Sequence, residues 1–216
     1  MFLHHDQRSR VTQPFVTLVI GGLLALGPIA ASPAHAEGPP ATSRSTETNY
    51  ESAEATKALA RLVDLAAERL MTADQVAASK WISGKPIEDS AREEQVLEAM
   101  NAEAQRLHLD QAVVRQIFKD QIEANKLVQQ GLHDRWKDYP QERPDSAPDL
   151  DHIRDEINRA NTAILTALQE SQSILRTPLC PTLRDNSTDS LVHDQHLNNL
   201  HTQGLQRALS GMCSAQ

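Results

Sequence analysis

Apolar residues recur at intervals of three and four along most of the chain after residue 50. This spacing places them on one face of an α-helix, whereas no segment alternates apolar and polar residues as a β-strand would. The first two predicted helices cover roughly residues 50–71 and 73–83. The next two carry the apolar positions 96–107 and 114–132. The last two cover roughly residues 150–175 and 188–212. The pattern therefore predicts an all-α fold, a single bundle of about six helices.

Capping residues mark where several of these helices begin. The sequence TADQ, which starts at Thr72, is a capping box for the segment that follows it. Asp89 or Ser90 caps the next helix, and Asp110 caps a long one. The three prolines of YPQERPDSAPD, residues 139–149, predict a helix-free connection before the fifth helix.

The first residues have the three parts of a secretory signal peptide. Cations precede an apolar run from Phe15 to Ala31, and the small-x-small sequence AHA ends at Ala36. A membrane anchor is the alternative, but Gly27 and Pro28 interrupt the run and no stop-transfer cations follow it. We therefore expect cleavage after Ala36 and a periplasmic or secreted protein.

The chain left after cleavage is long enough for one domain with a core. Residues 1–36 are the expected signal peptide, 37–48 a flexible leader, and 49–216 the helical domain. The full chain has a net charge of −8, and losing two basic residues and one acidic residue with the leader makes it −9. This acidic body argues against nucleic acid and membrane partners, which bind basic surfaces. Cys180 and Cys213 predict one structural disulfide in an oxidising compartment.

Polar residues interrupt the apolar stripes of several helices. On or beside the inward faces lie Arg69, Lys80, Arg92, Asn125, Gln129 and Arg154. Any one cation could extend its head to water at the rim of the core, or form a local ion pair such as Asp89 with Arg92. A converging set of buried, unpaired cations is costly. It therefore predicts a compact bound anion that carries more than one negative charge.

Other candidate sites are weaker. His193 and His196 have helical i,i+3 spacing and could hold a metal with Asp194. A solvated polar face explains these residues better, and no metal is predicted. The sequence has no Gly-rich phosphate loop, no Cys-x-x-Cys and no recognisable nucleophile motif, so covalent catalysis is not indicated.

One stretch resembles a known family, the exported AroQ-type (gamma subclass) chorismate mutases. It reads LVDLAAERLMTADQVAASKWISGKPIEDSAREEQVLEAM, and the shared features are the Arg after Glu, VAASKW, PIEDSAREEQ and, further on, DQIEANKLVQ. The likeness continues through the proline-rich connection and Arg154 to the two cysteines. It implies the 3,3-sigmatropic rearrangement of chorismate to prephenate, without a cofactor.

The resemblance implies catalytic roles for four residues. Arg69, helped by Asn125, would bind the ring carboxylate of chorismate, and Arg154 would hold the side-chain carboxylate. Lys80 would be shared between that second carboxylate and the ether oxygen. Gln129 would donate another hydrogen bond to the ether oxygen.

The resemblance also implies further substrate contacts and an assembly. Glu93 would accept a hydrogen bond from the ring hydroxyl, alongside the backbone near Asp89, and Arg92 would complete the positive wall. The expected assembly is a homodimer in which each site is built from one chain. The alternative function is that of a non-catalytic periplasmic helical protein that binds an anionic metabolite or a partner helix.

Overall fold

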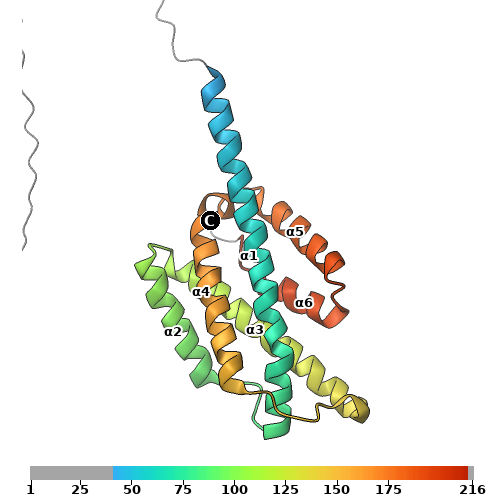
Figure 1. Ribbon diagram of the computed structural model, residues 1–216. Helices are drawn as coiled ribbons and strands as arrows, with labels where there is room; N and C mark the ends of the chain where they lie inside the picture. Colours follow the sequence, from blue (N-terminus) through green and yellow to red (C-terminus); the bar gives the residue numbers. More distant parts are fainter. Residues whose placement is uncertain (1–40, 214–216) are drawn as a thin grey trace, which may run out of the picture. The chain divides into compact units, whose positions relative to one another are not determined.

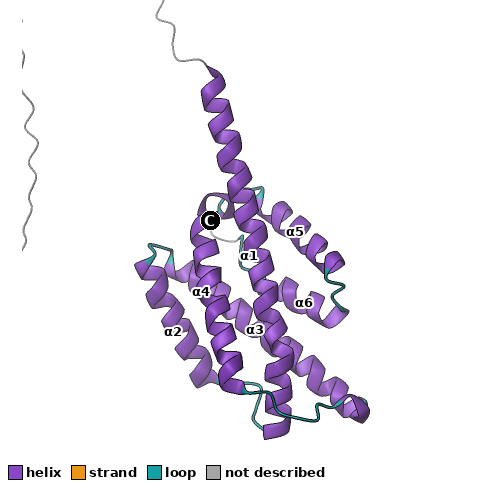
Figure 2. Ribbon diagram, in the orientation of Figure 1, coloured by secondary structure: helices purple, strands orange, loops and turns teal. Residues whose placement is uncertain are grey.

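The computed structural model describes residues 41–213, with side chains from residue 53 on. The predicted signal peptide and its cleavage site lie outside these residues. The described part of the chain is helical and has no strand (Figure 2), which confirms the all-α prediction. Its helices are α1 (Ala41–Ser83), α2 (Ser90–Arg106), α3 (Gln111–Asp138), α4 (Leu150–Leu175), α5 (Cys180–Asp194) and α6 (Asn199–Ala208).

Helices α1 and α4 form the most extensive packing pair of the bundle. α3 packs against α1, while α2 lies on one side of this group and α5 and α6 lie on the other (Figure 1). The fully buried large side chains include Leu59, Leu62, Leu70, Ile117, Phe118, Ile153, Ile164 and Leu165. They come from the apolar stripes of α1, α3 and α4, so the core forms where these stripes meet. No helix in the described range is long and apolar enough to cross a membrane.

Aspartate side chains cap the starts of three helices. Asp89 accepts a hydrogen bond from the Arg92 backbone N–H at 3.1 Å, and Asp110 accepts one from Ala112 at 2.9 Å. Both predicted caps are therefore confirmed. Asp149 does the same for α4, and a cap of this kind typically contributes about 1 kcal/mol. These three aspartates fix the entry points of α2, α3 and α4.

The first two predicted helices are a single helix. α1 is continuous across Thr72, so the predicted capping box is wrong. Thr72 is buried, and its hydroxyl donates back to the Arg69 carbonyl at 2.7 Å instead of capping a new helix. Buried Leu70 and Ala73 on either side continue the core stripe, and their packing favours an unbroken helix. α1 also begins at Ala41, within the segment 37–48 predicted as a leader.

The single helix predicted over 188–212 is wrong, because α5 begins at Cys180 and ends at Asp194. His196 takes a left-handed conformation with φ of 51°, and the Leu197 N–H donates to the Val192 carbonyl at 3.1 Å. This arrangement is a Schellman motif that terminates the helix. Asn198 then caps α6.

A disulfide joins Cys180 to Cys213, as predicted. It ties the first residue of α5 to the segment that follows α6. The α5–α6 pair is thereby closed into a covalent loop against the bundle.

The proline-rich connection between α3 and α4 contains one short 3₁₀ helix, η1 (Pro140–Glu142), so it is not wholly free of helix. Arg143 fastens this connection to the bundle. Its Nε donates to the Trp136 carbonyl at 2.8 Å, and its guanidinium lies 5.6 Å from the centre of the Trp81 ring. The contacts of Arg143 therefore hold the connection against the bundle before α4 begins.

Candidate functional site

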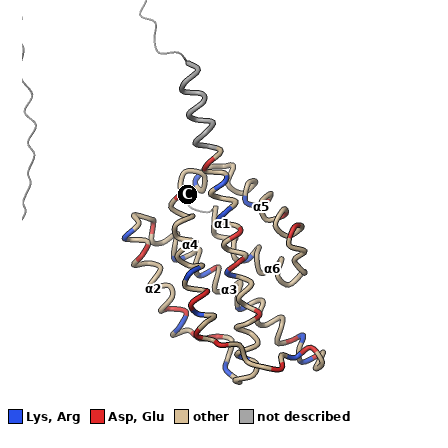
Figure 3. The backbone as a smooth tube through the Cα atoms, viewed as in Figure 1, with Lys and Arg blue, Asp and Glu red and all other residues tan. Residues whose placement is uncertain are grey.

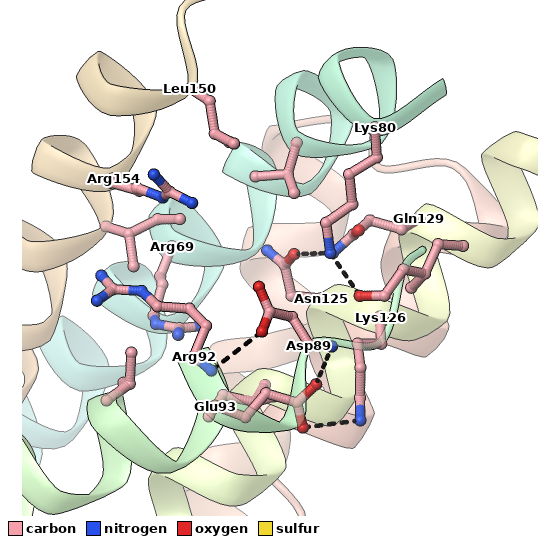
Figure 4. A pocket seen from close by; sticks show the side chains of 15 residues that line it. Arg69, Lys80, Asp89, Arg92, Glu93, Asn125, Lys126, Gln129, Leu150 and Arg154 are labelled. Atoms are coloured by element: carbon pink, nitrogen blue, oxygen red, sulfur yellow. Dashed lines mark hydrogen bonds and ion pairs between the residues drawn. The ribbon is translucent and has the colours of Figure 1, made fainter. Parts of the chain in front are cut away.

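A cavity of about 130 Å³ opens among α1, α2, α3 and α4. All eight polar residues predicted for the site line it, and Figure 4 shows them gathered around it: Arg69, Lys80, Asp89, Arg92, Glu93, Asn125, Gln129 and Arg154. Apolar side chains complete the wall: Val76, Ile87, Val96, Ile122, Leu150 and Ile157. The cavity thus offers polar contacts within a largely apolar lining, as small-molecule sites do.

The charge of the cavity is opposite to that of the chain. Five cationic side chains and two carboxylates line it, an excess of three positive charges, whereas the chain carries −8. Elsewhere in the described part of the molecule, charges of both signs are interspersed along the helices (Figure 3). The site therefore favours an anionic ligand with more than one negative charge.

Arg69 is the most buried cation of this site and is only 4% exposed. Its Nε donates to Asn161 Oδ1 at 2.7 Å, and its Nη1 donates to the Gln121 carbonyl at 3.0 Å. Burial lowers the pKa of the guanidinium to about 10. Arg69 is therefore still charged near neutral pH, and its charge is available to a ligand.

Lys80 is half-buried at the end of α1, and its Nζ donates to the Ile87 carbonyl in the turn before α2. Burial lowers the pKa of the Lys80 ammonium below the usual range. The carboxylates of Asp89 and Glu93 oppose this shift, whereas neighbouring cations reinforce it. Lys80 is therefore a cationic donor that loses its proton more easily than an exposed lysine does.

Two amides on α3 form a polar chain in the wall of the cavity. Gln129 Nε2 donates to Asn125 Oδ1 at 2.6 Å, and Asn125 Nδ2 lies 3.4 Å from the Thr72 hydroxyl. Asn125 is thus hydrogen-bonded to Gln129 and to Thr72. An amide nitrogen has two N–H groups, so Gln129 keeps one for a ligand. Both amides are buried, and each restricts the rotamer of the other.

Glu93 is held in place from two sides. Its Oε1 accepts from the Asp89 backbone N–H at 3.2 Å, and its Oε2 lies 3.1 Å from Lys126 Nζ. Lys126 also pairs with Glu123 at 2.8 Å. The Asp89 side chain is occupied as the α2 cap. The Glu93 carboxylate therefore has a fixed position, with lone pairs left to accept a ligand hydroxyl.

Arg92 and Arg154 lie together at one side of the cavity, across from Lys80 and Gln129 (Figure 4). Arg154 Nη1 contacts Asp151 Oδ1 at 3.0 Å, and its side chain is 40% exposed. Exposed ion pairs of this kind contribute at most about 1 kcal/mol, so Arg154 can exchange this partner for a ligand carboxylate at small cost.

Two polar residues in or next to the site were not predicted. Lys126 directly follows Asn125, off the apolar stripe, and nothing in the sequence links it to Glu93. Asn161 accepts a hydrogen bond from Arg69 and is 1% exposed. A signal for Asn161 did exist, because it is a polar residue within the apolar stripe of α4, seven positions after Arg154. The His193 and His196 rings lie 6.4 Å apart, and the side chains described, those of residues 53–213, include no cluster that could bind a metal.

Fold and site together define a small all-helical protein with a cationic cavity for a compact anion. Comparison with known proteins is consistent with this class. The family model of chorismate mutase type II matches residues 60–130. A secreted chorismate mutase of Mycobacterium tuberculosis is 37% identical over 163 residues, which cover 76% of this chain and 82% of that protein. A secreted chorismate mutase of Mycolicibacterium smegmatis is 34% identical, with 77% of this chain and 92% of that protein covered.

A solved structure extends the similarity to three dimensions. The chorismate mutase of Burkholderia thailandensis superposes with a TM-score of 0.69 and is 32% identical, with 72% of this chain and 99% of that chain covered. The chain belongs to the chorismate mutase family. It is an intramolecular isomerase that converts chorismate to prephenate.

Proposed function

We propose that the cavity among α1 to α4 is the chorismate mutase active site and that one chain supplies all of it. The observation that carries this proposal is the convergence of Arg69, Lys80, Gln129 and Arg154 on one cavity with an excess of positive charge. These residues come from three helices, α1, α3 and α4. Chorismate is a dianion, so its two carboxylates supply the negative charge that this cavity lacks.

In this proposal, two arginines hold the substrate by its ends. Arg69 binds the ring carboxylate at the base of the cavity, and Arg154 binds the side-chain carboxylate near the mouth. The reactive conformer of chorismate, with the flexible enolpyruvyl arm over the ring, is rare in solution. Binding both carboxylates makes it the bound conformer. Such positioning can contribute several kcal/mol to lowering a barrier.

Two donors act on the ether oxygen, where negative charge develops as its bond to the ring breaks. Lys80 donates from α1 and the free N–H of Gln129 donates from α3. Donors fixed before the reaction stabilise this charge without reorganising. The rearrangement is pericyclic, so no group has to transfer a proton or form a covalent bond to the substrate.

Glu93 accepts a hydrogen bond from the ring hydroxyl, and the backbone at Asp89 lies beside it. Lys126 and the Asp89 N–H support this role, because they hold the Glu93 carboxylate in a single orientation. Arg92 adds positive charge to the wall beside Arg154. These contacts select the ring of the substrate, whereas the two arginines select its carboxylates.

The same proposal extends to location and assembly. The relatives from three species are named secreted chorismate mutases, and this chain begins with the features of a signal peptide. We infer that the enzyme is exported, with cleavage after Ala36, and acts as a homodimer with each site within one chain. Light scattering of the purified protein tests the assembly, and a mass of one chain would contradict it.

The direct test of the function uses the protein purified without residues 1–36. Addition of this protein to chorismate should remove the chorismate absorbance and yield prephenate. The exposed-site variant Lys119→Ala serves as a control that keeps full activity, because Lys119 lies on the solvent face of α3. Folded protein that leaves the absorbance unchanged would contradict the proposed site.

A further inference from the structure

The buried charge of Arg69 is held by neutral groups. Its two hydrogen-bond acceptors are the Asn161 side-chain oxygen on α4 and the Gln121 backbone carbonyl on α3. Among residues 53–213, whose side chains the structure describes, no carboxylate pairs with Arg69, and burial is the cause that shifts its pKa. A guanidinium has five N–H groups, so three remain for a ligand after these two bonds.

Asn161 is placed to serve Arg69. It follows Arg154 by seven residues, so two turns of α4 separate them and both lie on the same face of the helix. Asn161 is 1% exposed, and its amide nitrogen has no hydrogen-bond partner within the described residues. A buried amide with an unused donor is unfavourable for folding. Within the described part of the chain, the bond from Arg69 Nε at 2.7 Å is the one hydrogen bond of this side chain.

The choice of an amide over a carboxylate has a chemical consequence. A buried arginine is usually paired with a carboxylate, which forms stronger, charge-assisted hydrogen bonds. Aspartate has nearly the same shape as asparagine and would stabilise the buried cation more. It would also cancel the charge that attracts the substrate. Asparagine fixes the direction of the guanidinium and leaves its charge uncompensated.

We propose that Asn161 is a positioning residue that orients Arg69 toward the cavity and keeps its positive charge free for the substrate carboxylate. This inference rests on the proposed role of Arg69 in binding the ring carboxylate. Asn161 itself does not touch the substrate. It acts by holding Arg69 Nε, while the three N–H groups of Arg69 not bonded to Asn161 or to the Gln121 carbonyl are left for the ligand.

Asn161→Asp separates this role from a structural one. The variant gains a buried ion pair, so its Tm without ligand should equal or exceed that of the wild type. Its KM for chorismate should rise about 10- to 100-fold, the effect of losing one charged contact. Prephenate, the dianionic product, should raise the Tm of the wild type and raise that of the variant much less. A purely structural role predicts instead that Tm and activity fall together.

Three results would overturn the proposal. One is an Asn161→Asp variant with wild-type KM and a full Tm shift with prephenate. Another is a variant whose lower Tm accounts for its loss of activity. The third concerns the control Asn186→Asp, which adds the same charge at an exposed position of α5 and should keep the wild-type KM. A rise in its KM equal to that of Asn161→Asp would overturn the proposal.

The outcome for Arg69→Ala shows which claim has failed. If Arg69→Ala keeps the wild-type KM and kcat, the proposed function of Arg69 is wrong. If Arg69→Ala raises KM and Asn161→Asp does not, only the role of Asn161 is wrong.

A measurement on the wild type keeps the proposal testable if Asn161→Asp does not fold. The Nε–H proton of Arg69 can be identified by NMR as the signal that Arg69→Lys removes. Because Nε donates to buried Asn161, this proton should exchange slowly with solvent both with and without prephenate. Fast exchange in the ligand-free protein would overturn the proposal.

Discussion

Lys80 and Gln129, the two donors proposed for the ether oxygen, differ in their chemistry. Gln129 carries an amide, which donates at any pH. Lys80 carries an ammonium whose pKa burial lowers. Around neutral pH both are donors, so kcat/KM should stay flat from mildly acidic to mildly alkaline conditions. The contributions of the two residues to kcat/KM can be distinguished by substituting one of them or by varying the pH.

Gln129→Glu should turn this flat profile into one that falls as the pH rises. A carboxylate must be protonated to donate to the ether oxygen, and when ionised it repels the developing negative charge. Near neutral pH we expect a loss of kcat/KM of about 10²- to 10³-fold, partly recovered in acid. The measurement is a pH series of kcat/KM for both proteins. A flat profile for Gln129→Glu would exclude Gln129 as the donor.

The alkaline limb of the wild-type profile should report Lys80. Because its pKa is lowered, Lys80 loses its proton at a lower pH than an ordinary lysine, and kcat/KM should decline there. The bound dianion favours the charged form, so the limb of kcat should lie at higher pH than that of kcat/KM. The measurement is a pH series of kcat and kcat/KM. If their alkaline limbs lie at the same pH, a group other than Lys80 titrates.

At the scale of helices, the sequence predicts elements that begin with a side-chain cap and carry one clear stripe. α2 and α3 are of this kind, because Asp89 and Asp110 mark their starts. Tertiary packing overrides local signals elsewhere. Thr72 looks like a cap but is buried within α1, and His196 ends α5 although it is neither Gly nor Asn.

The residues of the site likewise include some that could be predicted from the sequence and some that could not. Polar residues on apolar stripes, such as Lys80 and Gln129, could be predicted because their helical phase shows in the sequence. Lys126 could not, because its place depends on how α2 and α3 cross. The positions of hydrogen-bond acceptors such as the Gln121 carbonyl also follow only from the packed structure.

Arg143 is expected to position α4 through the proline-rich connection. Arg143→Ala removes the bond to the Trp136 carbonyl and the contact with Trp81, so the segment before Arg154 should loosen. We expect kcat/KM to fall several-fold, mostly through KM, with a loss of stability of about 1 kcal/mol. Arg159→Ala, an exposed arginine on α4, is the matched control. Equal kinetics for the two variants would contradict this role.

At the scale of the whole molecule, the disulfide and the proposed active site occupy different parts of the bundle. Cys180–Cys213 closes a loop with a sequence separation of 33 in the α5–α6 region, whereas the cavity lies among α1 to α4. The double variant Cys180→Ser/Cys213→Ser should lose about 3–4 kcal/mol of unfolding free energy. It should keep near-wild-type kcat/KM at a temperature where it remains folded. Denaturant unfolding and a kinetic assay measure the two effects, and a large kinetic loss in folded protein would link the disulfide to the site.

The central claim is that a cationic cavity within one chain performs the rearrangement, with Lys80 acting on the ether oxygen. The most direct test compares kcat/KM for Lys80→Ala and Lys119→Ala, which remove the same charge from the site and from the solvent face. Loss of one fixed donor at an atom that develops charge typically costs about 3–4 kcal/mol. Lys80→Ala should therefore lower kcat/KM by at least about two orders of magnitude, while Lys119→Ala stays at the wild-type value. A folded Lys80→Ala protein with near-wild-type turnover would contradict the proposed site.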